Sequence, residues 1–162
     1  MPNEKPRRYT HDSPWFKLVN RIFVVLNRIG IAPAGHLYVL SIKGRKSGKM
    51  LSTPLAIVTM NGKKYVAALA EVNWVRNARA AGWGLLSKGR YKERVRLVEL
   101  PVDEERREAL REYSRQIPHG AEHFKRAHGI SGDAESFAAI AAILPVFRMD
   151  PWPGSSRTAA TT

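Results

Sequence analysis

An Asn61-Gly62 pair stands between two apolar runs near the middle of this chain. Both residue types accept the positive φ angles of a two-residue turn, so the pair predicts a tight β-hairpin. The flanking runs, 51–60 and 64–70, are expected to form its two strands. Because a hairpin joins antiparallel strands, the middle of the chain is predicted to form antiparallel sheet.

Apolar patterning predicts further strands and helices around this hairpin. Strands are expected over 36–42, near Leu85 within 82–89, over 93–100 and over 144–149. Helices are expected over 71–81, 103–116, 119–128 and 133–142. The order is a helix, a β-meander with one helical excursion, several helices and a closing strand. This order predicts an α+β fold with a mainly antiparallel sheet or barrel and peripheral helices.

An amphipathic helix is predicted near the N-terminus, with Ser13 as its cap, Pro14 at its first position and Gly30 at its end. Apolar residues recur at helical spacing, and polar residues take the other side. The apolar set is Trp15, Val19, Ile22, Leu26 and Ile29, with Phe16 and Phe23 beside them, and the polar set is Lys17, Asn20, Arg21, Asn27 and Arg28. Such a helix either packs its apolar face on the barrel or rests on an anionic membrane surface, and the two uses are compatible.

The length of 162 residues predicts a single domain, which we place over 14–150. Residues 1–13 are polar and basic and are expected to form a flexible arm. Residues 151–162 are rich in Pro, Gly, Ser and Thr and are expected to form a flexible tail. The chain contains no cysteine, which excludes disulfides, thiolate metal sites and cysteine nucleophiles.

The net charge of +13 is concentrated at the N-terminal end, where residues 1–50 carry ten basic and two acidic side chains. A basic surface attracts phosphate ligands, anionic lipid or nucleic acid. No helix-turn-helix or aromatic RNA-binding signature is present, so we expect no nucleic-acid partner. The longest apolar stretch, 22–26, is too short to cross a bilayer, and no secretory signal is visible. A cytoplasmic location is therefore expected, with peripheral contact at the inner face of the membrane as an option, and the sequence leaves the oligomeric state open.

A basic, glycine-containing loop is predicted between the strands at 36–42 and 51–60. Its residues are Gly44, Arg45, Lys46, Ser47, Gly48 and Lys49. The glycines allow a tight turn whose backbone N–H groups face an anion, the basic residues add positive charge and the serine adds a hydroxyl donor. The loop is not a Walker A motif, because only three residues separate the glycines and Met50 follows Lys49. On the residues alone, an anion cradle and a solvated basic turn are equally acceptable interpretations.

The segment 73–77 begins a predicted helix directly after a strand, and it contains Trp74 and Asn77. A helix N-terminus attracts anions, and an indole packs well against a flat ring. The alternative, which the pattern alone favours, is that Trp74 anchors the core while Arg76 and Arg79 are solvated.

Other catalytic or metal chemistry is not indicated. His119 and His123 are spaced for one helix face, but no HExxH pattern is present and Pro118 stands directly before them, so no metal site is expected. No serine lies in a GxSxG nucleophile elbow, so no catalytic side chain is predicted.

Three segments together resemble one known family. Residues 40–49 (LSIKGRKSGK), the Thr53-Pro54-Leu55 triplet and residues 74–81 (WVRNARAA), in this order and spacing, are similar to the deazaflavin-dependent nitroreductases. Members of that family are split β-barrel proteins related to the pyridoxamine-phosphate-oxidase-like flavin binders. The resemblance covers about 36–100, with a closing strand near Phe147, and implies an FMN-binding-like split β-barrel.

The resemblance also implies a function and a cofactor site. Family members typically use reduced coenzyme F420, an 8-hydroxy-5-deazaflavin, to deliver hydride to quinones, nitro compounds or activated alkenes, and FMN is the less expected cofactor. By position, Arg45, Lys46, Ser47 and Lys49 would hold the phosphate and polyglutamate tail, Thr53, Pro54 and Leu55 would line the ring pocket, and Trp74 and Asn77 would lie beside the ring and the small-molecule electron acceptor.

The sequence departs from the family pattern at two places. Leu51 stands where family members often have an arginine. Many members also have a Gly- or Ser-containing stretch before the helix with the tryptophan, where this chain has the short stretch 68–73, and Glu71 in it would add negative charge near the cofactor site. These departures leave an alternative function, in which the chain binds another flavin, or binds a fatty-acid-like ligand without catalysis at the membrane surface.

Overall fold

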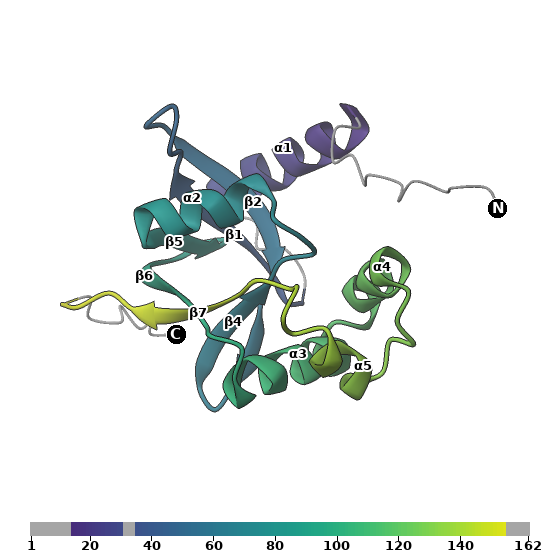
Figure 1. Cartoon of the computed structure of the whole chain (residues 1–162). Coiled ribbons are helices and arrows are strands. Elements are labelled where there is room, and N and C mark those ends of the chain that lie inside the picture. The colour runs from purple at the N-terminus through teal and green to yellow at the C-terminus, as the bar shows by residue number, and fades with distance from the viewer. Residues whose placement is uncertain (1–13, 31–34, 155–162) are drawn as a thin grey trace.

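The structure is a computed structural model that describes residues 14–30 and 35–154. Within them lie one seven-stranded sheet and five helices (Figure 1). The strands are β1 (Leu37–Lys43), β2 (Met50–Ala56), β3 (Val58–Met60), β4 (Lys63–Ala67), β5 (Trp83–Lys88), β6 (Tyr91–Glu99) and β7 (Val146–Pro151). The helices are α1 (Pro14–Arg28), α2 (Asn73–Ala81), α3 (Glu104–Gln116), α4 (Pro118–His128) and α5 (Ala134–Ala139).

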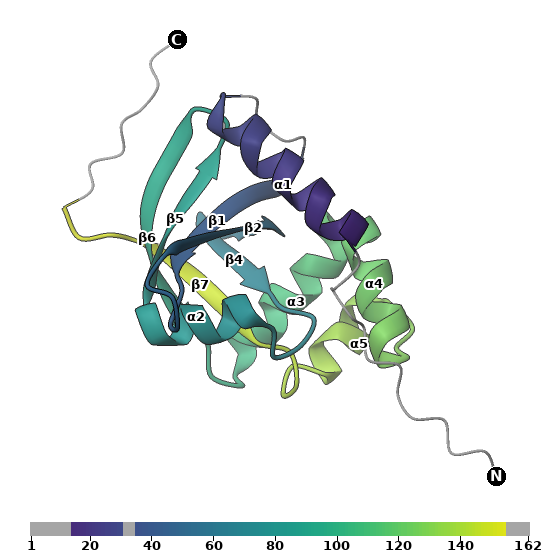
Figure 2. The same cartoon turned by 90° about the horizontal axis from the view of Figure 1, so that it is seen from above.

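The sheet is antiparallel throughout and runs in the order β2-β1-β5-β6-β7-β4-β3. It curls into a half-barrel, with α1 across one end and α3, α4 and α5 gathered on the opposite side (Figures 1 and 2). The predicted fold class, an α+β split β-barrel with an N-terminal helix and peripheral helices, is confirmed.

Two hydrophobic cores lie on the two faces of the sheet. One fills the inside of the half-barrel, where Leu40, Leu86 and Phe147 pack with Val75 and Ala78 of α2, as part of a larger cluster. The other joins the outer face of β3, β4 and β7 to the helices α3, α4 and α5. Alternation along the strands assigns residues to the two cores, because successive side chains point to opposite faces. Helix α2 therefore belongs to the barrel interior, next to the strands that carry the candidate site.

The predicted hairpin turn is confirmed, but the strand predicted over 51–60 is wrong. Asn61 and Gly62 have φ angles of 51° and 73° and join β3 to β4. The segment before them divides at Ile57 into β2, which pairs with β1, and β3, which pairs with β4. These two strands form the opposite edges of the sheet. The chain therefore passes from one edge of the sheet to the other at Ile57, within a segment that the sequence shows as one continuous apolar run.

Several predicted helix and strand ends also differ from the structure, and three of them flank loops. Strand β4 ends at Ala67, helix α2 begins at Asn73, and helix α5 ends at Ala139. Between β4 and α2 the chain forms a turn, in which the Val72 N–H donates to the Ala70 carbonyl. This main-chain hydrogen bond joins residues that are two positions apart, whereas those of an α-helix join residues four apart, so no helix begins at Glu71.

Helix α1 is present, but the predicted division of its faces is wrong. Asn27, predicted on the outer side, is buried, and its amide donates to Ser87 Oγ (2.7 Å) and accepts from the Gly89 N–H (2.6 Å). Ile22 and Ile29, predicted on the inner side, are 49% and 66% exposed. The reason is that the β5–β6 turn needs polar partners, and the Asn27 amide supplies both a donor and an acceptor.

Tyr65 provides a prediction on pH dependence. Its hydroxyl donates to Glu105 Oε1 (2.9 Å), and burial together with this bond raises its pKa to about 12. The folded state therefore favours the neutral phenol, so this contribution to stability is complete below the ordinary tyrosine pKa and is lost as the pH rises towards 12. Burial also raises the pKa of Tyr113, so we expect an ultraviolet titration of the phenolates to show a late phase from both residues. Tyr65→Phe should remove the earlier part of this late phase, and Tyr113→Phe should leave that part in place. Ionisation of Tyr65 near the ordinary value would contradict this assignment.

Candidate functional site

The candidate site begins at the tip of the β1–β2 hairpin. The two strands pair up to Lys43 and Met50, so residues 44–49 form the complete turn. The turn closes on its own backbone, because the Gly44 N–H donates to the Lys49 carbonyl and the Gly48 N–H donates to the Gly44 carbonyl, both at 2.8 Å. Gly48 has a φ of +66°, a conformation that side chains other than that of glycine rarely adopt. The predicted tight loop is confirmed.

The backbone of this tip is largely occupied by the protein itself, which differs from the expected backbone cradle. Protein acceptors take the N–H groups of Gly44, Arg45, Gly48 and Lys49. Within the described structure, hydrogen bonds are not seen for the N–H groups of Lys46 and Ser47. Any attraction for an anion at this tip therefore comes chiefly from side chains.

Asn77 of α2 holds the tip in place. Its side chain is 4% exposed, and its Oδ1 accepts hydrogen bonds from the Arg45 N–H (3.2 Å) and from Arg45 Nη1 (2.9 Å). The structure thus joins two site residues that were predicted separately and lie 32 positions apart. Because one buried acceptor binds both donors, it holds the main chain of Arg45 and one nitrogen of its guanidinium in place. No pattern in the sequence indicates this pairing.

The tip carries positive charge without compensating carboxylates. Arg45, Lys46 and Lys49 are exposed, and none of them forms an ion pair among the described residues. Glu71, the acidic departure from the family pattern, is bound instead by Arg79 through two bonds of 2.7 Å. The hydrogen bond from Arg79 lowers the pKa of Glu71, and Arg79 also binds Glu99. The negative charges of Glu71 and Glu99 are therefore balanced by ion pairs with Arg79.

Strand β2 continues from the tip as an edge strand and contains the three residues that were predicted to line a ring pocket. Thr53 and Leu55 lie opposite Leu40 and Tyr38 of β1, which pack in the barrel interior. Residues directly opposite in a sheet share a face, so Thr53 and Leu55 face inward. Pro54, between them, takes the other face, and its missing N–H is acceptable at an edge. The triplet therefore offers two side chains, not three, to the inside of the barrel.

Trp74 is part of the interior core. Its ring is half-buried and lies 5.7 Å from that of Phe147, measured between ring centroids. It lies one helical turn before Asn77, so both side chains belong to the same side of α2. The packing role is shown by these contacts, and a role beside a bound ring stays a prediction.

One hollow was not indicated by the sequence. It has a volume of about 320 Å³ and is lined by Tyr38, Lys64, Lys88 and Tyr91, from four different strands. Lys88 Nζ lies 4.8 Å from the centroid of the Tyr38 ring. Because Tyr38 is also the cross-strand neighbour of Leu55, the hollow adjoins the far end of the predicted ring pocket. Only the strand pairing brings these residues together.

The described residues contain no group of three or more potential metal ligands. His128, one of the histidines weighed for a metal, instead has its Nε2 2.8 Å from the Leu69 carbonyl. Within the same part of the chain, no helix has the length and apolar character needed to cross a membrane.

Comparison with known proteins places the fold. No protein-family model matches the sequence, and no curated protein is significantly similar to it. A solved structure described as a domain-swapped dimer is similar with a TM-score of 0.56 and 20% identity, over 85% of this chain and 100% of that one. The structure of an F420-H2 dependent reductase, FDR-A, is similar with a TM-score of 0.53 and 22% identity, over 71% of this chain and 94% of that one. The chain therefore shares the split β-barrel fold with an F420-H2 dependent reductase.

Proposed function

We propose that this protein is an oxidoreductase that binds reduced coenzyme F420 and transfers hydride to a small-molecule acceptor such as a quinone, a nitro compound or an activated alkene. The observation that carries the proposal is the Arg45–Asn77 contact, which anchors a basic hairpin tip to α2. It joins two of the segments on which the family resemblance rests. The shared fold with an F420-H2 dependent reductase supports the same conclusion.

The residues at the tip fit a polyanionic tail. Arg45, Lys46 and Lys49 are exposed cations without ion-pair partners in the described structure, and the Ser47 hydroxyl stands among them. Guanidinium groups bind phosphate through paired hydrogen bonds, and ammonium groups act as point charges. FMN presents a single phosphate, whereas the F420 tail adds several carboxylates. Three cations on one short turn therefore favour F420.

The remaining residues would orient and shield the ring. Thr53 and Leu55 face the barrel interior from the edge strand, and Trp74 supplies an apolar wall from α2. When bound, the deazaflavin supplies the hydride, so no protein nucleophile is required. The protein contributes by fixing the tail through Arg45, which Asn77 positions, and by keeping water away from the inner face of β2.

Titration of the purified protein with F420 tests the proposal. We expect a saturable change in the cofactor's absorbance or fluorescence at micromolar concentrations, and weaker binding of FMN under the same conditions. Oxidation of reduced F420 in the presence of a quinone is then expected to depend on the protein. Absence of F420 binding at micromolar cofactor would overturn the proposal. Tighter binding of FMN than of F420 would identify FMN as the cofactor instead.

A further inference from the structure

The outward face of helix α1 carries a continuous apolar stripe. Leu18, Ile22, Val25 and Ile29 are 50%, 49%, 49% and 66% exposed. Their spacing of four, three and four residues places them along one side of the helix. Contiguous exposed apolar side chains of this kind mark an interaction surface more often than scattered ones do. Other described parts of the chain leave this stripe exposed.

The stripe is exposed because the opposite side of α1 is fixed to the sheet. Asn27 binds the β5–β6 turn through Ser87 and Gly89, and the helix packs along β2. Rotation of the helix to bury the stripe would break these two bonds and leave a buried amide without partners. The exposure of the apolar side is therefore built into the way the helix is held.

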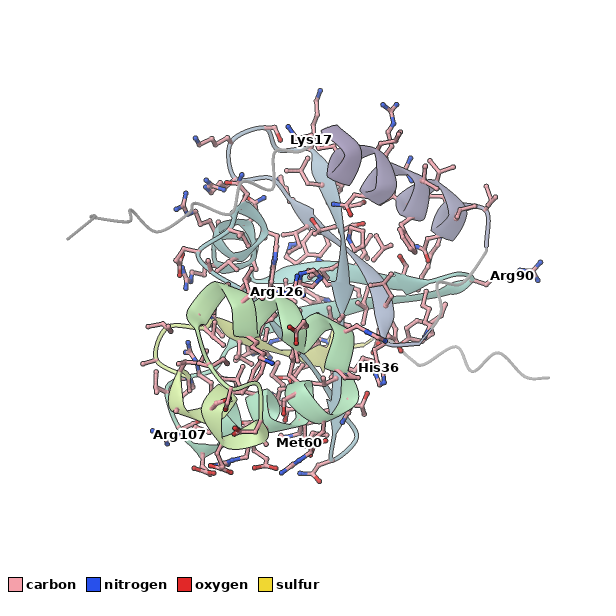
Figure 3. The ribbon with its side chains drawn as sticks, turned by 90° about the vertical axis from the view of Figure 1, so that its right-hand side faces the viewer. Lys17, His36, Met60, Arg90, Arg107 and Arg126 are labelled. Atoms are coloured by element: carbon pink, nitrogen blue, oxygen red, sulfur yellow. The ribbon has the colours of Figure 1, made fainter. Side chains whose placement is uncertain are left out.

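Charge on this side of the molecule is of one sign. Helix α1 contains Lys17, Arg21 and Arg28 and no acidic residue, and both arginines are exposed. From 14 to 56, which covers α1, β1, the hairpin tip and β2, the sequence has seven Lys and Arg and no Asp or Glu. The helix α3 alone has four of the fourteen acidic residues. Lys17 on α1 and Arg107 on α3 lie at opposite ends of the molecule (Figure 3). The face that contains α1 and the hairpin tip is thus basic, and carboxylates are concentrated away from it.

From these observations we infer that α1 lies in the headgroup region of an anionic phospholipid bilayer, with its apolar stripe inserted. An apolar stripe with flanking arginines and no acidic residue is the pattern of interfacial helices. Anionic lipid complements the charge, and each basic residue near such a surface adds to binding. A second copy of the chain is a poorer occupant, because it would bring Arg21 and Arg28 of one copy towards those of the other. The inference is independent of the cofactor.

Sedimentation with vesicles tests the inference on the full chain. We expect binding to vesicles of phosphatidylcholine with phosphatidylglycerol, weak binding to phosphatidylcholine alone, and release by salt. The double variant Ile22→Glu/Val25→Glu should reduce binding by at least about tenfold, because it removes inserted apolar area and adds like charge to the lipid. The matched control is Ile143→Glu, since Ile143 is 58% exposed and lies between α5 and β7. It should bind as the unchanged protein does.

A second set of variants tests the electrostatic contribution to membrane binding. Arg21→Gln/Arg28→Gln should weaken binding to the anionic vesicles and flatten its salt dependence, whereas Arg107→Gln on α3 should not. Circular dichroism of each variant verifies the fold. Equal binding by the α1 variants and their controls would overturn the inference. So would a protein dimer in sedimentation equilibrium that the Ile22→Glu/Val25→Glu variant dissociates, because a second copy would then cover the stripe.

Discussion

Replacement of Arg106 by methionine is expected to lower the free energy of unfolding by about 2–4 kcal/mol. Arg106 is 7% exposed, and its guanidinium donates to the carbonyls of Leu100 (2.8 Å) and Leu144 (2.5 Å). These bonds tie α3 to the segments that lead out of β6 and into β7. Methionine retains much of the apolar volume but leaves both carbonyls without this donor in a buried place. The measurement is chemical denaturation of the variant and the unchanged protein.

The opposing effect is the cost of burying a charge. Desolvation lowers the pKa of Arg106, and its Nε has no hydrogen-bond partner among residues 14–30 and 35–154. A buried charge can sometimes be replaced by an apolar residue without loss. Here the acceptors are main-chain carbonyls, which the substitution does not remove, so we expect the lost hydrogen bonds to dominate. Arg107→Met is the matched control, since Arg107 is more exposed and forms a 3.7 Å ion pair with Glu104 at the surface. Equal stability of the two variants would show that the carbonyl bonds contribute little.

The sequence predicted those parts of the fold that depend on local conformation. Asn61-Gly62 specifies its turn through φ angles that few other residues accept, and Gly48 does the same at the hairpin tip. The strand β6 followed from alternation, because Val95 and Leu97 are buried while Arg94 and Arg96 are exposed. In each case the information lies within a few neighbouring residues.

The rest could not be predicted because it depends on contacts between distant segments. The division at Ile57 sends β2 and β3 to opposite edges of the sheet, although both pieces are apolar and extended. Asn27 and Arg106 look like surface residues in their helices, yet both are buried because they bind main-chain groups of other elements. Polar residues that serve distant backbone groups leave no periodic signal.

The candidate site shows the same division. The resemblance selected the basic tip and α2, but the geometry changes what each contributes. Acceptors within the tip and on Asn77 take the N–H groups of Gly44, Arg45, Gly48 and Lys49, so chiefly side chains remain for an anion. Asn77 contacts the tip itself, through Arg45, and Pro54 faces away from the interior that Thr53 and Leu55 share. These details follow from strand register and helix placement.

The double variant Arg45→Ala/Lys46→Ala is expected to raise the dissociation constant for F420 by about 10- to 100-fold. Charge-assisted hydrogen bonds to phosphate are the strongest contacts that the exposed tip can offer, and solvent screening limits their contribution. Fluorescence titration measures the change, and the remaining affinity should depend less on salt. Arg107→Ala/Arg126→Ala removes the same net charge from α3 and α4 and should leave the affinity unchanged. A similar loss in both double variants would mean that overall charge, not the tip, attracts the cofactor.

Asn77 allows the position of Arg45 to be tested apart from its charge. Asn77→Leu removes the acceptor of two Arg45 bonds but leaves every charge of the tip in place. If Asn77 acts by positioning the Arg45 guanidinium, its effect on F420 affinity should shrink when Arg45 is already alanine, and the part that remains reports the bond to the main-chain N–H of residue 45. The double-mutant cycle of Arg45→Ala and Asn77→Leu measures this coupling directly. Additive losses would instead show that Asn77 does not act through the Arg45 side chain, and an unchanged affinity in Asn77→Leu would show that the tip binds without being held by α2.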